Sequence, residues 1–270
     1  MLNAPQNRKR PLTYASYLRL NELLALQTPQ CDPPRSDELH FIITHQAIEL
    51  WFKLLITQVR DARSALAAGE WNRANLVVKR MISVSEAVLG QMRTLQRMAP
   101  TAFYEFRAAL GPASGAQSRQ FRHLEVLCGI RSERHIAMMR AFDRGQLGAD
   151  IVSALDESSL RETFLRAIQG AGYRRVADVY LNAAEDNAAY LVAELLVDFD
   201  EVWIRWRSEH QTLAERMIGR SRGTGGTVGE FLERNRQYRF FPELWDCRHQ
   251  ILHRVRATVM DSPRSPMCSQ

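Results

Sequence analysis

Two segments of this chain place apolar side chains at steps of three and four residues, the period of one face of an α-helix. The first segment runs from about Ser36 to Ala67, and Ser36 or Asp37 could cap its start. The second runs from about residue 185 to residue 218. Each therefore predicts a long helix with one buried face. The two stripes are Phe41, His45, Ile48, Phe52, Leu55 and Val59, and Phe199, Trp203, Trp206, His210, Leu213 and Met217.

The rest of the chain also favours helices, because period-two alternation and β-branched runs are scarce. Helical spacing predicts further helices over residues 14–27, 73–98, 101–110, from about 117, in several short pieces over 129–185, and over 230–258. We therefore expect an all-α fold, with residues 1–270 as a single domain built as a bundle of long helices. Residues 1–12 are polar and contain proline, so we expect a mobile arm there.

Composition narrows the class of protein. A formal charge of +6 is modest, no Lys/Arg run reaches the density of a nucleic-acid-binding tail, and no zinc-finger or RNA-binding signature is present, so we expect no nucleic-acid partner. The four cysteines form no CxxC pair, which fits a reducing cytoplasmic setting. The N-terminus has no apolar signal region, and no uncharged apolar run approaches the ~18 residues of a membrane span. We therefore expect a cytoplasmic protein without membrane contact.

Each apolar stripe carries one histidine near its middle. A neutral imidazole on an apolar helical face can ligate haem iron, so His210 is a candidate ligand. His45 could be a ligand, a base or a core histidine, and taken alone each histidine also fits a core position satisfied by a neighbour. Because the two lie on the two most apolar helices, they predict a shared pocket in which one serves the metal and the other faces the substrate.

Two further features could bind anions. The glycine-rich loop SRGTGGTVG, residues 221–229, carries Arg222 and Thr224, which could hold a carboxylate, an ammonium or a propionate. It lacks the GK[ST] of a P-loop, and a flexible connection is the other interpretation. Arg107 lies beside aromatic residues in FYEFRAALGPASG and could grip a carboxylate through two hydrogen bonds, or be an ordinary surface arginine.

Five segments together resemble the tryptophan 2,3-dioxygenase family and occur in the family's order. They are LTYASYLRLNELL, FIITHQAIELWFKLL, ALGPASGAQSRQFRHLE, WRSEHQTLAERMIGRSRGTGGTVG and FFPELWDCRH. The resemblance implies an all-helical protein with a haem pocket, assembled as a homotetramer that is a dimer of dimers. It also implies haem b, active in the ferrous form, with dioxygen and tryptophan or a tryptophan-derived molecule as substrates.

The resemblance implies a role for each matching position. His210 matches the iron ligand, and Ser114 matches a serine near the haem; Arg222, in the glycine-rich loop, is then a candidate to bind a haem propionate. His45 matches the catalytic distal histidine that hydrogen-bonds the indole N–H, beside Phe41. The other implied substrate-binding residues are Arg107 at the carboxylate, Phe103 next to it, Thr224 at the amino-acid end, and Tyr14 and Tyr17 from a neighbouring subunit.

Three positions depart from the family pattern. Phe103 replaces a tyrosine beside the substrate carboxylate, Ala116 replaces an aromatic residue of the loop, and Phe121 replaces a tyrosine. Residues 130–185 also match the family poorly. These changes suit a substituted tryptophan in a natural-product pathway, as for the haem enzyme of maremycin biosynthesis.

The expected reaction inserts oxygen from O2 into the indole C2–C3 region, giving a product of the N-formylkynurenine type. Two alternatives remain open. One is a monooxygenase that gives a 2-oxindole or hydroxyindole in secondary metabolism, and the other is a non-catalytic haem sensor.

Overall fold

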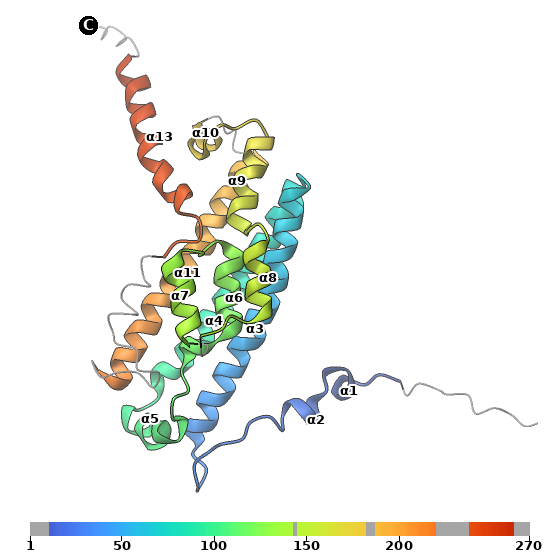
Figure 1. The fold of residues 1–270 in the computed structure, drawn as a ribbon, viewed down its shortest axis with the longest axis vertical. Coiled ribbons are helices and arrows are strands. Elements are labelled where there is room, and N and C mark those ends of the chain that lie inside the picture. Colours follow the sequence, from blue (N-terminus) through green and yellow to red (C-terminus); the bar gives the residue numbers. More distant parts are fainter. Residues whose placement is uncertain (1–10, 143–144, 182–186, 220–237, 262–270) are drawn as a thin grey trace, which may run out of the picture.

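The computed structural model describes residues 11–142, 145–181, 187–219 and 238–261 (Figure 1). Every secondary-structure element within these ranges is a helix, which confirms the all-α prediction. Three long helices form the frame: α3 (Ser36–Ala67), α4 (Trp71–Thr94) and α11 (Ala188–Ile218). Helix α4 packs against both α3 and α11. The bounds predicted for α3 agree with those observed, and α11 begins within a few residues of its predicted start.

Shorter helices cover this frame. Helices α6 and α9 pack on α3, α8 packs on α6, and α10 and α13 pair at the end of the molecule opposite α5 (Figure 1). Helix α5 contacts both α3 and α11. Their bounds are α5 Pro100–Arg107, α6 Arg119–Cys128, α7 Glu133–Phe142, α8 Ala149–Asp156, α9 Leu160–Gly170, α10 Val176–Leu181 and α13 Pro242–Asp261. Single 3-10 turns cover Leu95–Arg97, Ala108–Leu110 and Gly115–Gln117.

The two predicted stripes form much of the core. Leu55 and Val59 on α3 and Phe199 on α11 are fully buried, and Phe52 packs on Trp203 with 6.1 Å between ring centroids. Burial of side chains of this size stabilises a fold by roughly 1.5–3 kcal/mol each. Both stripes become only half-buried at the positions nearest the histidines, which are Phe41, His45, Trp206 and His210.

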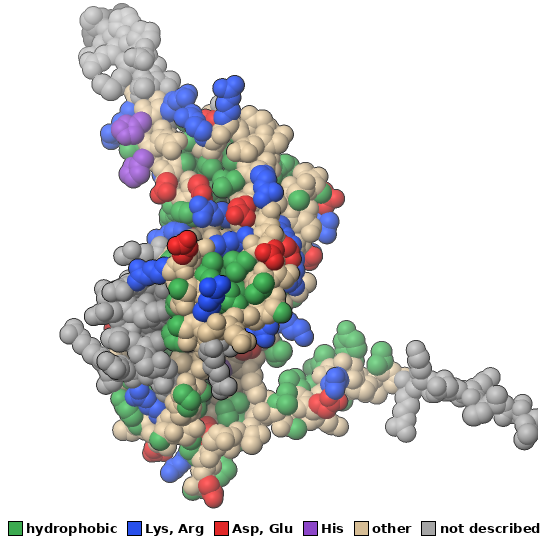
Figure 2. All heavy atoms as spheres, in the orientation of Figure 1, with side chains coloured by type: hydrophobic (Ala, Val, Ile, Leu, Met, Phe, Trp, Pro, Cys, Tyr) green, Lys and Arg blue, Asp and Glu red, His purple; other side chains and the backbone are tan. Residues whose placement is uncertain are grey.

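The N-terminal segment corrects one prediction. Instead of one helix over residues 14–27, two short helices form, α1 (Tyr14–Leu18) and α2 (Leu20–Leu23). Arg19, between them, has a left-handed backbone with φ of 52°. Helices this short are marginal in water without a packing surface. The segment extends away from the bundle and carries several exposed apolar side chains (Figures 1 and 2).

The start of α3 also differs from the sequence expectation. The cap position is Arg35, which makes no side-chain capping bond, and Ser36 is the first helical residue. Glu38, in the first turn, instead accepts hydrogen bonds from the backbone N–H of Gln30 (2.6 Å) and Cys31 (3.0 Å). That carboxylate holds the preceding segment against the helix, in the first turn where a negative charge is favoured.

Helix α3 is the one described helix that is long and apolar enough to cross a membrane by length and composition. The apolar core helices of globular proteins satisfy the same criterion. Only 28% of its most apolar stretch is buried within this single chain. Exposed apolar residues form a stripe along it, consisting of Leu39, Ile43, Leu50 and Leu54.

Candidate functional site

The two histidine helices present their half-buried stretches to a common region. His45 on α3 is close enough to His210 on α11 for its charge to contribute to the lowered pKa of His210. Helix α5, which contacts both long helices, covers the same end of the bundle (Figure 1). The structure therefore brings together the two histidines that the sequence separates by more than half the chain.

His210 is presented as a neutral imidazole. Burial lowers its pKa to about 4, with smaller contributions from His45 and Arg122. Its ring stacks on Trp206, with 5.2 Å between centroids and 15° between planes. Across the described residues, no hydrogen bond engages either ring nitrogen of His210. A single neutral imidazole held among aromatic side chains is a donor that suits haem iron.

The hydrogen bond of His45 determines its tautomer. Its Nδ1 lies 2.8 Å from the backbone carbonyl oxygen of Phe41. Because a carbonyl oxygen only accepts, Nδ1 must carry the proton and donate. Burial lowers the pKa of His45, while the Phe41 carbonyl and Glu49 oppose that shift. The imidazole is therefore neutral near pH 7, and its Nε2 offers a lone pair that can accept a hydrogen bond.

Phenylalanine rings form a wall beside His45. The Phe41 ring lies 4.0 Å from that of His45, 5.4 Å from Phe106 and 6.0 Å from Phe103, centroid to centroid. Phe103 and Phe106 meet edge to face at 5.3 Å. Sequence reasoning missed Phe106, which is fully buried, although its spacing of three from Phe103 on one helix could have revealed it. The wall suits a flat aromatic ring.

Arg107 is the last residue of α5 and is half-buried. Its guanidinium lies 5.5 Å from the centroid of the Tyr104 ring. Because α5 also carries Phe103 and Phe106, the aromatic wall and this cation are held by the same short helix. Such an arrangement can bind the carboxylate of a ligand whose ring lies against the wall.

Ser114 begins a compact loop that ends at Ser118. Its backbone N–H donates to Gln117 Oε1 (3.0 Å), and its Oγ accepts from the Ala116 N–H (3.3 Å). Ala116 is the position where the resemblance leads us to expect an aromatic residue. Its carbonyl accepts from Arg122 Nε at 3.4 Å, so the loop is fixed by backbone contacts without that ring.

The remaining predicted residues either lie outside the described part of the chain or lie apart from the two histidines. Thr224 and Arg222 lie outside the described residues, as do residues 1–10 of the expected arm. Tyr14 and Tyr17 lie on α1, 76% and 72% exposed, well away from the bundle that holds the histidines (Figure 1). Neither tyrosine contacts a described site residue of its own chain.

The sequence did not predict a buried ionic cluster, which consists of Arg122, Glu125, His135 and Arg207. Glu125 forms ion pairs with Arg122 (2.6 Å) and Arg207 (3.6 Å), and its Oε2 lies 3.3 Å from His135 Nε2. Burial alone would raise the pKa of Glu125, but these partners lower it to about 2. The i,i+3 spacing of Arg122 and Glu125 could have suggested the first pair. The cluster keeps a carboxylate charged inside the bundle.

Asp200 and Arg207 hold the segment that precedes α13. Asp200 accepts from the backbone N–H of Phe240 (2.7 Å) and Phe241 (3.0 Å) and from Trp245 Nε1 (3.1 Å). Arg207 donates to the Tyr238 carbonyl oxygen at 3.2 Å. The segment is thereby tied to the same helix that carries His210.

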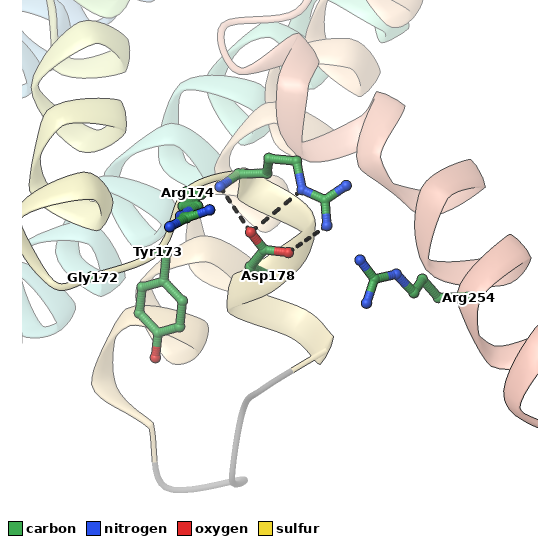
Figure 3. Close-up of a pocket in the computed structure, with 6 residues that line it drawn as sticks. Gly172, Tyr173, Arg174, Asp178 and Arg254 are labelled. Atoms are coloured by element: carbon green, nitrogen blue, oxygen red, sulfur yellow. Dashed lines mark hydrogen bonds and ion pairs between the residues drawn. The ribbon is translucent and has the colours of Figure 1, made fainter.

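A cavity of about 460 Å³ lies at the opposite end of the molecule, between the start of α10 and α13 (Figure 3). Arg174, Arg175 and Arg254 line it, and the Arg175 guanidinium is bound by Asp178 at 2.7 Å. No residue predicted for the functional site borders this cavity.

Comparison with known proteins identifies relatives over nearly the full length. The family model described as tryptophan 2,3-dioxygenase matches residues 3–176 and 155–251. A tryptophan 2,3-dioxygenase of Nocardioides sp. is 38% identical over 256 residues, which is 89% of this chain and 95% of the relative. Those of Saccharopolyspora erythraea and Herpetosiphon aurantiacus are 35% and 33% identical, covering 90% and 89% of this chain and 94% and 98% of their own lengths.

Proposed function

Because the chain belongs to the tryptophan 2,3-dioxygenase family, whose members are haem-dependent oxidoreductases, we propose that it inserts both atoms of O2 across the C2–C3 bond of L-tryptophan. The product would be N-formylkynurenine. The observation that carries this proposal is the pairing of two neutral histidines in one region, His210 without a hydrogen-bond partner among the described residues and His45 with an accepting Nε2.

His210 would hold the haem. When bound, the haem supplies the iron that activates O2, and the protein supplies orientation and the surrounding electrostatics. The stack on Trp206 limits rotation of the imidazole, and the low pKa keeps the ring unprotonated and able to bind a metal. Ser114 and Arg222 are the further residues that we propose at the haem, Ser114 from the family resemblance and Arg222 as a cation of the glycine-rich loop that could bind a propionate.

His45 would orient the indole. Its Nδ1 proton is committed to the Phe41 carbonyl, so Nε2 faces a ligand only as an acceptor, which matches an indole N–H donor. The rings of Phe41 and Phe103 would pack on the indole plane. Holding the indole in this way would fix its C2–C3 bond relative to the haem, and orientation of this kind accounts for much of the rate of such reactions.

Arg107 would bind the carboxylate of the amino acid, with Thr224 at its amino-acid end. Phe103 supplies no hydroxyl there, so Arg107 carries more of the carboxylate recognition than it would beside a tyrosine. This difference favours a second candidate substrate, a β- or ring-substituted tryptophan, and leaves monooxygenation to a 2-oxindole or hydroxyindole as the alternative reaction.

A neighbouring subunit would complete the site. Tyr14 and Tyr17 are exposed on a segment that leaves its own bundle, and α3 has an exposed apolar stripe. Both features support a homotetramer, because contiguous exposed apolar surface marks interaction sites. Light scattering of the purified protein measures the assembly. The predicted cytoplasmic location stays a prediction.

Oxygen uptake by the haem-loaded, reduced protein tests the function. Addition of L-tryptophan should start O2 consumption in step with the absorbance of N-formylkynurenine. Uptake only with substituted tryptophans would identify the second candidate substrate. Haem binding with no uptake for any indole amino acid would indicate a haem sensor and contradict the proposed enzyme.

A further inference from the structure

Glu49 lies four residues after His45 on α3, so the two side chains share a helix face. It is half-buried, and both of its carboxylate oxygens are engaged. Oε1 accepts from Ser118 Oγ at 2.5 Å, and Oε2 accepts from Gln120 Nε2 at 3.0 Å. The Gln120 amide also donates to the Glu49 backbone carbonyl at 2.9 Å. All three bonds join the histidine helix to the start of α6.

Ser118 connects this carboxylate to two structures. It is the N-cap of α6, where its Oγ accepts from the Phe121 N–H at 3.2 Å. It is also the last residue of the Ser114–Ser118 loop, and its N–H donates to the Gly115 carbonyl at 3.0 Å. Its hydroxyl proton therefore goes to Glu49 while its lone pair caps the helix. Glu49 thus fixes the loop and the helix start with one contact.

The opposite side of the loop is held by Arg122, whose Nε donates to the Ala116 carbonyl and whose Nη1 binds the buried Glu125. The loop is therefore held between Glu49 on α3 and the ionic cluster of α6. Phe121, next to Arg122, packs on Trp206 with 5.0 Å between centroids, and Trp206 stacks on His210. A shift at the start of α6 would therefore reach His210 through these rings, while Glu49 connects the same point to the helix that carries His45.

We propose that Glu49 is a positioning residue of this site: its carboxylate holds the Ser114–Ser118 loop and the start of α6 at a fixed distance from the helix that carries His45. The effect of Glu49 on turnover rests on the proposed function, whereas its effect on the position of the loop does not. A carboxylate is needed because two donors, a hydroxyl and an amide N–H, converge on it, and a glutamine would offer one acceptor and an additional donor.

The test compares Glu49→Gln with Asp61→Asn, which removes an exposed carboxylate from the same helix. Hydrogen exchange of the haem-free proteins measures directly how well the backbone amides of the loop are protected from solvent. We expect the amides of residues 114–121 to exchange faster in Glu49→Gln, and the rest of α3 and the Asp61→Asn protein to exchange as wild type. Unchanged exchange in this segment would overturn the proposal whether or not the protein is an oxygenase.

The second readout uses the haem-loaded proteins. Glu49→Gln should retain haem, should lower kcat on the order of tenfold with a smaller change in KM, and should broaden the C–O stretching band of the ferrous carbonyl complex. Absence of tryptophan turnover in wild type would contradict the proposed function. The exchange result alone would then test whether Glu49 holds the loop. Wild-type turnover with kcat and band shape unchanged in Glu49→Gln would overturn the positioning role.

Gln120→Met is a second variant in case Glu49→Gln does not fold. It keeps the Glu49 charge and the Ser118 bond, and it removes both Gln120 contacts. We expect the same changes to a smaller extent. Loss of helical circular dichroism in both variants would make the contact a requirement of folding and would overturn the positioning role.

Discussion

The indole of Trp206 stacks on the imidazole of His210, with the ring centroids 5.2 Å apart and the planes inclined by 15°. The two residues are four apart on α11, so the helix itself places one ring over the other. The stack restricts the orientation of the imidazole before any ligand arrives. A donor that is already oriented loses less conformational freedom when it binds.

Replacement of Trp206 by alanine should therefore weaken haem binding. Stacked aromatic pairs contribute about 0.5–1.5 kcal/mol, which corresponds to a 2- to 10-fold lower affinity in a haem titration. Trp206→Phe keeps a ring at this position and is the matched control, with an affinity near that of wild type. Equal affinities for Trp206→Ala and wild type would show that the stack does not prepare the ligand.

Replacement of Arg107 by alanine should raise the KM for tryptophan. A hydrogen bond to a charged group contributes about 1.5–3 kcal/mol, so we expect an increase of roughly 10- to 100-fold with haem content unchanged. Arg97→Ala, which removes an exposed arginine close by in the chain, serves as the control. Unchanged kinetics in Arg107→Ala would remove Arg107 from the substrate site.

Phe103→Tyr should restore a hydroxyl beside the substrate carboxylate. We expect a KM for tryptophan lower by up to about tenfold, since the new bond would be made to a charged group. Steady-state kinetics with tryptophan and a β-substituted tryptophan measure the effect and its selectivity. If the KM of the variant rises for both substrates, the hydroxyl has no acceptor there and Phe103 is suited to another ligand.

Glu125→Gln should destabilise the fold at neutral pH by about 3–5 kcal/mol, because Arg122 and Arg207 would lose the carboxylate that pairs with them. The pKa of Glu125 is lowered to about 2 in the folded chain, so its contribution is present above the ordinary carboxyl pKa and is lost as the pH falls from about 4.5 toward 2.

Urea unfolding of wild type and variant at several pH values measures this difference, which should shrink in acid. Glu133→Gln, on the exposed start of α7, should match wild type throughout. A difference between wild type and Glu125→Gln that stays constant down to pH 3 would contradict an ionised, paired Glu125.

The sequence predicts most of the helices because their signals are local. The stripe from Phe41 to Val59 predicted α3 correctly, and the stripe from Phe199 to Met217 predicted α11. The segment around Arg19 was predicted wrongly as one helix because helical spacing does not say whether a packing surface exists. Its two short helices bury no residue against the described part of the chain.

The site was only partly predictable. His45 and His210 could be chosen because the two lie on the two most apolar stripes and the resemblance covers both, and Arg107 because the resemblance covers it. Glu49 was missed because its role depends on contacts between helices that lie far apart in sequence, whereas Phe106 and Arg122 had local signals, the i,i+3 spacings to Phe103 and Glu125, that were not used. Glu49 meets Ser118 across 69 positions, a relation that no local pattern encodes.

The most direct test of the central claim is the fate of ¹⁸O2 in the product made from L-tryptophan by the haem-loaded protein. A tryptophan 2,3-dioxygenation predicts N-formylkynurenine with label in both the formyl and the ketone oxygen, and no product from His210→Ala. A product with a single labelled oxygen, or labelled product from His210→Ala at the wild-type rate, would contradict the account.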